Sequence, residues 1–274
     1  MVARPIDVTI FYAFVCNEMF DPCYVGLIPN ENVKVTTPFG HSKNGKTQMF
    51  KAIVTIESNM FALLLKPNEA GKRDQIVADR LKHLFNLKPM NCFALQLKFV
   101  VVEGVQIDSP AIEYIAMPCP FLQLTYEHQA LPTLSSWTGQ RSKAFDVELL
   151  KIAMFRYIIG TTKSLPEHIL IVEGMPLSIS EMVISSFGLP SDFMNILSFD
   201  HWEEARDALV ANFDNDQMRG IILQTERCER LMFHRSAKGP LSLPAMRITE
   251  IIEERVDLIS SCTLDQLKLI LAGK

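Results

Sequence analysis

Residues 154–182, MFRYIIGTTKSLPEHILIVEGMPLSISEM, combine a helix end, a polar loop and a short hairpin. The apolar residues before Gly160 recur at helical spacing, which predicts a buried helix that ends at the glycine. After the loop, residues 169–172 and 177–179 read as two short strands joined by a Glu-Gly turn. The stretch therefore predicts a helix, a loop and a hairpin in that order.

The rest of the chain divides into a strand-rich part and a helical part. Residues 1–118 read mostly as strands, with one helix over residues 74–87 whose apolar side chains share a face. Residues 119–274 read mainly as helices, with the loop and hairpin of residues 160–182 among them. The pattern predicts an α+β protein of two lobes, a mainly β lobe over residues 1–118 and a mainly helical lobe over residues 119–274.

Several elements can be given approximate bounds. Residues 8–15 and 92–103 read as apolar strands, and residues 145–159 read as a core helix. Ser198 is expected to cap a helix over residues 199–213, because a serine hydroxyl can accept a hydrogen bond from the first free backbone N–H groups.

The order of helix, loop and hairpin resembles the catalytic segment of distant kinase-like families, the HipA-type and phosphoinositide-kinase-type proteins. In those families the loop reads Gly-x-x-Asp-x-x-x-x-Asn, in which the Asp is the catalytic base and the Asn binds metal, and the hairpin ends in a second metal-binding Asp. Counted from Gly160, the base position is Lys163, the Asn position is His168, and the hairpin Asp falls on Ser180. The resemblance implies a degenerate catalytic loop, and therefore a pseudokinase-like protein without efficient phosphoryl transfer.

The first part of the chain extends this resemblance. A strand ends in Lys66 and Pro67, and the kinase-like families use a strand lysine to contact the phosphates of ATP and to pair with a helix Glu. The matching helix position is Gln75, which forms hydrogen bonds but supplies no counter-charge. The resemblance implies ATP as the cofactor, with Lys66 as its contact. Magnesium binding is expected to be weak or absent, and no residue is assigned as a metal ligand.

A second motif points to a different class of nucleotide-binding protein. Residues 40–47, GHSKNGKT, fit the P-loop pattern G-x-x-x-x-G-K-[ST], and the residues that fit it are Gly40, Gly45, Lys46 and Thr47. A P-loop follows a buried strand and opens a helix, whereas the Asn-Gly pair within this motif is a strong signal for a hairpin turn. A helix over residues 48–57 would favour a P-loop nucleotide hydrolase, and a strand there would favour the kinase-like interpretation.

Composition limits the partners and the location. The chain of 274 residues has a net charge of −4 and an isoelectric point near 5.9, which argues against general binding to nucleic acid. It contains no apolar run of the roughly 20 residues that a membrane span needs, and its start lacks a signal-peptide pattern. The six cysteines form no Cys-x-x-Cys pair, which favours buried reduced thiols over a zinc site. We expect a cytoplasmic protein that acts through a protein partner, and a structural or assembly subunit that binds no nucleotide is the remaining alternative.

Overall fold

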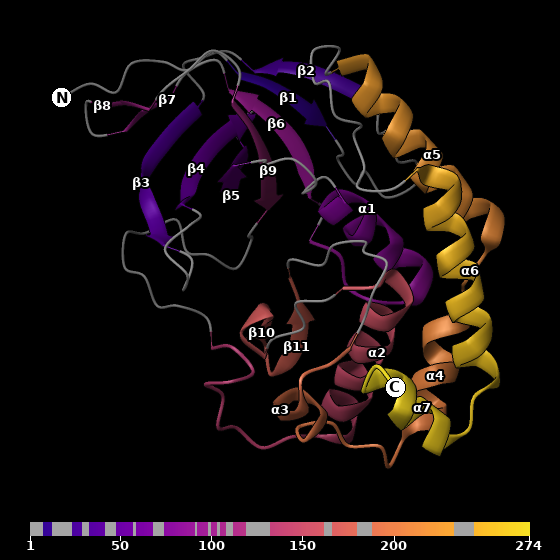
Figure 1. Cartoon of the computed structure of the whole chain (residues 1–274). Coiled ribbons are helices and arrows are strands. Elements are labelled where there is room, and N and C mark those ends of the chain that lie inside the picture. The colour runs from indigo at the N-terminus through magenta and orange to yellow at the C-terminus, as the bar shows by residue number, and fades with distance from the viewer. Residues whose placement is uncertain are drawn as a thin grey trace. The chain divides into compact units, whose positions relative to one another are not determined.

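The structure is a computed structural model of the whole chain. It describes residues 8–12, 24–28, 33–41, 48–56, 59–67, 74–90, 92–97, 100–102, 105–107, 112–118, 132–161, 166–179, 188–232 and 244–274. The described residues form an α+β protein with strands concentrated in the first part of the chain and helices in the second (Figure 1). Contacts divide the chain into two compact units, Met1–Ile76 with Met90–His128, and Val77–Pro89 with Gln129–Lys274.

The first unit contains a seven-stranded antiparallel sheet with the strand order β2-β1-β6-β9-β5-β4-β3. A separate two-stranded ribbon pairs the short strands β7 and β8. The strands are β1 (Val8–Tyr12), β2 (Tyr24–Ile28), β3 (Val33–His41), β4 (Gln48–Ile56), β5 (Asn59–Pro67), β6 (Phe93–Leu97), β7 (Val100–Val102), β8 (Val105–Ile107) and β9 (Ile112–Pro118).

Strands β3 and β4 form an antiparallel pair in which His41 lies opposite Gln48. The register shifts on both sides of Pro38, and β3 lies at an edge of the sheet, where a residue without a backbone N–H is tolerated. The P-loop interpretation of residues 40–47 requires a helix after Thr47, and the structure has strand β4 there instead. The strand there favours the kinase-like interpretation over the P-loop, and the β-branched residues of β4 explain the preference for a strand.

Other strands differ from the sequence-based expectation. One strand was expected over residues 92–103, whereas β6 and β7 belong to two different sheets. Strands β2 and β8 were not expected, because five and three residues give too short a pattern for a period to be recognised. The expected strand ending in Lys66 and Pro67 is confirmed as β5, in which Lys66 pairs with Ile115 of β9.

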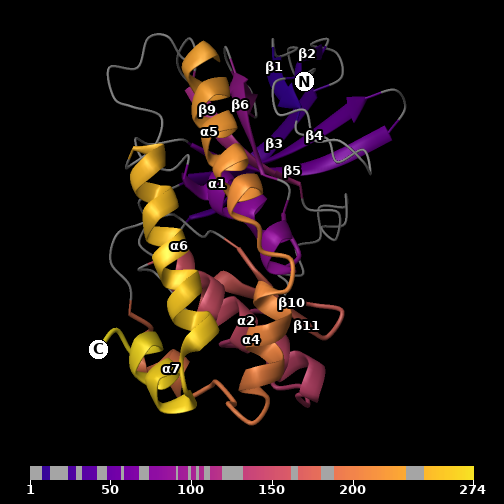
Figure 2. The same ribbon diagram turned by 90° about the vertical axis from the view of Figure 1, so that its right-hand side faces the viewer.

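The second unit is built around helix α2, which packs against α4, α6, α7 and strand β11. The hairpin lies on one side of α2, and α4 and α6 lie on the other (Figures 1 and 2). Its elements are η2 (Lys82–Phe85), α2 (Lys143–Ile159), η3 (Pro166–His168), β10 (Ile169–Val172), β11 (Met175–Ser178), α3 (Ser191–Met194), α4 (Trp202–Val210), α5 (Asn215–Met232), α6 (Ala245–Ser261) and α7 (Leu264–Leu271). Among the described helices, none is long and apolar enough to cross a membrane.

The helix predicted over residues 74–87 is present as α1 (Asp74–Leu81), followed by the 3₁₀ turn η2. We placed this helix with the strands, but residues 77–89 belong to the helical unit by their contacts. The ring of Phe85 is fully buried, with its centroid 5.3 Å from that of Phe155 in α2 and 5.1 Å from that of Phe213. The apolar face of this segment therefore contributes to the core around α2.

The ends of two helices show how local sequence sets their bounds. Helix α2 begins after Ser142, whose hydroxyl accepts a hydrogen bond from the N–H of Phe145, and it ends at Gly160 with a left-handed φ of 78°. The predicted stop at this glycine is confirmed. Ser198, by contrast, does not cap α4, because its side chain bonds to Asp200 and the helix begins only at Trp202.

Candidate functional site

The end of the polar loop lies beside the end of the hairpin. Residues 162–165 of the loop lie outside the described part, and the chain resumes in η3, which ends at His168. The backbone N–H of Ile179, just after β11, donates to the carbonyl oxygen of His168 at 3.0 Å. Strands β10 and β11 pair in antiparallel register between these two points. The structure thus brings His168 close to the residues that lead into Ser180.

Arg156 joins the last turn of α2 to this meeting point. Its side chain is fully buried, which is rare for an arginine and requires that its donors find acceptors. The Nε atom donates to the hydroxyl oxygen of Ser178 at 3.2 Å, and Nη2 donates to the carbonyl oxygen of His168 at 3.3 Å. One guanidinium group therefore holds the loop end and the hairpin end together.

Lys82 reaches the same strand end from η2. Its Nζ atom donates to the carbonyl oxygen of Ser178 at 2.7 Å and lies 3.4 Å from the Oδ1 atom of Asp79. Both Lys82 and Asp79 are buried, so this contact is protected from solvent screening. Ser178 consequently accepts from one cation through its side chain and from a second through its backbone.

A third buried cation links α2 to the end of η2. The Nζ atom of Lys151 donates to the carbonyl oxygen of Asn86 at 2.6 Å and to Glu148 at 2.8 Å. Asn86 has a left-handed φ of 51°, which ends the 3₁₀ turn and leaves its carbonyl directed to the lysine. Lys151, Lys82 and Arg156 thus tie η2, α2 and the hairpin to one another at the ends of these elements.

The three side chains of this arrangement are positively charged, and they hold the ends of the elements in place. Each of the three side chains donates to a backbone carbonyl oxygen, so together they fix where the elements begin and end. Among the described residues, no group of His, Cys, Asp and Glu is arranged to hold a metal ion. The surroundings of Ser178 contain one ammonium and one guanidinium group, and the carboxylate of Asp79 lies beside the ammonium group.

The structure places only some of the residues predicted for the site. His168 is half-buried in η3, whereas Lys163 and Ser180 lie outside the described residues. Gln75 lies in α1 with 3% of its surface exposed. Lys66 lies in β5, where only the backbone is described, so its expected contact with Gln75 stays a prediction.

The P-loop candidates fall on the β3–β4 connection. Gly40 is within β3, whereas Gly45, Lys46 and Thr47 lie outside the described residues. The strand that follows them removes the structural basis for assigning them to a phosphate site.

The three cations of the site, Arg156, Lys82 and Lys151, were not found from the sequence. Arg156 follows Phe155 inside an apolar helix, and Lys82 lies within the apolar pattern of residues 74–87. For Arg156 the available signal was its spacing: it is four residues after Ile152 and three before Ile159, which puts it on the buried face. A charged residue at such a position requires polar partners in the core.

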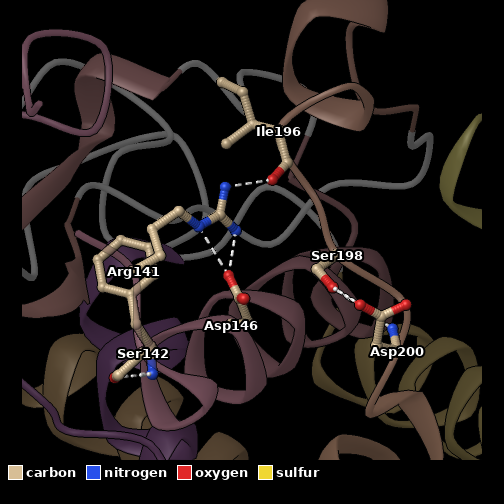
Figure 3. A network of polar contacts seen from close by, with 7 residues as sticks. Arg141, Ser142, Asp146, Ile196, Ser198 and Asp200 are labelled. Carbon is tan, nitrogen blue, oxygen red and sulfur yellow. Dashed lines mark hydrogen bonds and ion pairs between the residues drawn. The ribbon is translucent and has the colours of Figure 1, made fainter. Parts of the chain in front are cut away.

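A second polar cluster lies at the start of α2 (Figure 3). Arg141 donates through Nε to Asp146 at 2.7 Å and through Nη1 to the carbonyl oxygen of Ile196 at 2.6 Å, and its Nη2 atom also pairs with Asp146. The guanidinium carbon lies 5.2 Å from the ring centroid of Phe145. Arg141 therefore links the segment around Ile196 to Asp146 in the first turn of α2, and the carboxylate of Asp146 has a structural role there.

Comparisons with known proteins give low similarity. No family model and no curated protein matches the sequence. Among solved structures, the chain is similar to the crystal structure of the proinflammatory kinase CtkA of Helicobacter pylori, with 11% identity and a TM-score of 0.45 over 86% of this chain and 94% of that one.

The chain is also similar to PAN3 of Neurospora crassa. The match to PAN3 (pseudokinase and C-term) in complex with PAN2 has 12% identity and a TM-score of 0.34 over 91% of this chain and 66% of that one. The match to the PAN3 pseudokinase alone has 8% identity and a TM-score of 0.31 over 82% and 62% of the two chains. The chain therefore spans about two thirds or less of these PAN3 chains. A kinase and a pseudokinase are thus among the solved structures that this chain resembles at low identity.

Proposed function

We propose that this two-lobed protein is pseudokinase-like: it binds ATP through Lys66 without efficient phosphoryl transfer and acts through contacts with a protein partner. The frame of a kinase-like catalytic segment supports this proposal, because α2 ends at Gly160 and the loop end meets the β10–β11 hairpin. The positions that would carry the base and the metal ligands in that frame are Lys163, His168 and Ser180. None of these side chains is a carboxylate or an amide.

The observation that carries the proposal is the convergence of two buried cations on Ser178. Ser180 follows two residues later, and two residues of chain span at most about 7 Å. A magnesium ion bound there would lie on the order of 10 Å from these cations. At that distance each unit positive charge opposes a divalent ion by about 3 kcal/mol at an effective dielectric constant of 20, reduced for Lys82 by its contact with Asp79.

The side chains available as ligands at these positions also disfavour magnesium. Magnesium prefers carboxylate and water oxygens in octahedral geometry, whereas an imidazole prefers softer metals and a serine hydroxyl is a neutral donor. A protonated lysine at the base position offers no acceptor for the proton of a substrate hydroxyl. Phosphoryl transfer depends mainly on positioning and electrostatic stabilisation, so the loss of the metal removes most of the catalytic effect.

The decisive test is turnover of labelled ATP by the purified protein with magnesium or manganese. We expect no release of labelled phosphate above background and no transfer to added protein. The variants Glu167→Gln and Glu181→Gln are measured in parallel, since these are the carboxylates nearest in sequence to the degenerate positions. Activity that either variant abolishes would mean that the catalytic site has migrated to that residue, and the proposal would fail.

Binding of ATP is tested separately by thermal unfolding. A ligand that binds only the native state stabilises it by about 2.7 kcal/mol at one hundred times its dissociation constant, so ATP should raise the melting temperature. We expect Lys66→Met to abolish this rise, because it removes the charge and keeps the length of the side chain. Lys88→Met is the matched control, because Lys88 is exposed and lies in the other compact unit. An equal rise in both variants would exclude Lys66 as the phosphate contact.

The same experiment addresses the alternative that the protein is an assembly subunit that binds no nucleotide. If ATP leaves the melting temperature of the unmodified protein unchanged at millimolar concentration, with and without magnesium, that alternative replaces the nucleotide-binding part of the proposal. The absence of turnover alone does not separate the two functions, so both measurements are needed.

A further inference from the structure

We draw no further inference here: the strongest candidate, the surface of helices α5 and α6 where Leu223 and Met246 are exposed, carries nothing because the described residues do not show what covers it.

Discussion

Arg156 is the residue on which the candidate site depends most directly. Replacing it with Met keeps the apolar stem and removes both donors, which leaves the acceptors on Ser178 and His168 with fewer partners in the core. Hydrogen bonds from a charged group contribute about 1.5–3 kcal/mol each, so we expect Arg156→Met to lower the free energy of unfolding by about 2–4 kcal/mol in urea titration.

Two variants make this prediction specific to the buried geometry. Arg247→Met removes an equal charge from an exposed pair with Glu250 and should cost less than about 1 kcal/mol. Arg156→Lys keeps the charge but cannot present the planar fork to two acceptors, so its loss should be intermediate. Equal losses for Arg156→Met and Arg247→Met would show that the buried guanidinium does not hold the loop and hairpin.

Tyr157 gives a prediction for alkaline pH. Burial raises the pKa of its phenol above the usual value of 10.0, and the nearby Arg255 partly offsets this effect. The folded state therefore keeps the proton that the unfolded state loses, so the free energy of unfolding should fall as the pH rises above about 10. We expect Tyr157→Phe to make that fall shallower in urea titrations between pH 9.5 and roughly 11.

The control for this pH dependence is Cys262→Ala. Burial also raises the pKa of the Cys262 thiol, whose usual value is 9.0, so its contribution begins at a lower pH than that of Tyr157. Cys262→Ala should flatten the curve between pH 9 and 10, and because Cys262 also raises the pKa of Tyr157, it should make the fall above 10 shallower without removing it. A curve above pH 10 that is unchanged by Tyr157→Phe would contradict the assignment to the phenol.

At the scale of elements, substitution of glycine by alanine should change the free energy of unfolding in opposite directions at two positions. A Cβ atom at Gly139 would lie 2.6 Å from the indole of Trp137, which stacks on Phe145 with 4.6 Å between ring centroids. Either the indole or the backbone at Gly139 must shift, and we expect Gly139→Ala to lower the free energy of unfolding by about 1–2 kcal/mol.

Gly220 lies in helix α5, where an added Cβ meets nothing within 4 Å. Alanine is favoured over glycine in a helix by about 0.5–1 kcal/mol, so Gly220→Ala should raise the stability by that amount. Thermal unfolding of the two variants beside the parent protein measures both effects. A loss of stability in Gly220→Ala would mean that this face of α5 is covered in solution.

The sequence predicted elements best where one local signal was enough. The stop of α2 at Gly160 and the strand β10 follow from a left-handed glycine and a short apolar run, and both were predicted. Strand β11 begins at Met175, two residues before the expected start, because the turn is confined to Glu173 and Gly174, both with positive φ. Element ends that depend on a neighbouring side chain, such as the start of α4, were placed wrongly.

The sequence predicted the order of elements at the candidate site but not the buried charged residues that join them. The order of loop and hairpin is local in sequence, so a pattern revealed it. The contacts of Lys82 with Ser178 and of Lys151 with Asn86 join residues 96 and 65 positions apart, respectively. Spacing can place a charged residue on the buried face of its own helix, but it does not identify a partner so far away in the sequence.

At the scale of the whole molecule, the helical unit is discontinuous in sequence. Residues 77–89 supply Val77, Leu81 and Phe85 to its core, and each of these side chains is fully buried. We therefore expect a fragment of residues 129–274 to bind the dye ANS and to unfold without a cooperative transition, as partly folded chains with exposed apolar surface do.

A synthetic peptide of residues 74–90, added in excess, should restore cooperative unfolding and reduce the dye signal. A peptide with Phe85→Ala is the control, because it lacks the ring that packs against Phe155 and Phe213. Cooperative unfolding of the fragment without any peptide would show that the segment is dispensable.

Because the helical unit is discontinuous in sequence, its parts are synthesised at different times. Residues 77–89 are made before the sheet strand β9 and well before α2, at roughly 5–20 residues per second. Phe85 is therefore made several seconds before Phe155, against which it packs, and strand β5 is made before its neighbour β9. Neither compact unit can bury its whole core until its later residues are made, so the incomplete chain exposes unpaired strand edges and apolar helix surface together.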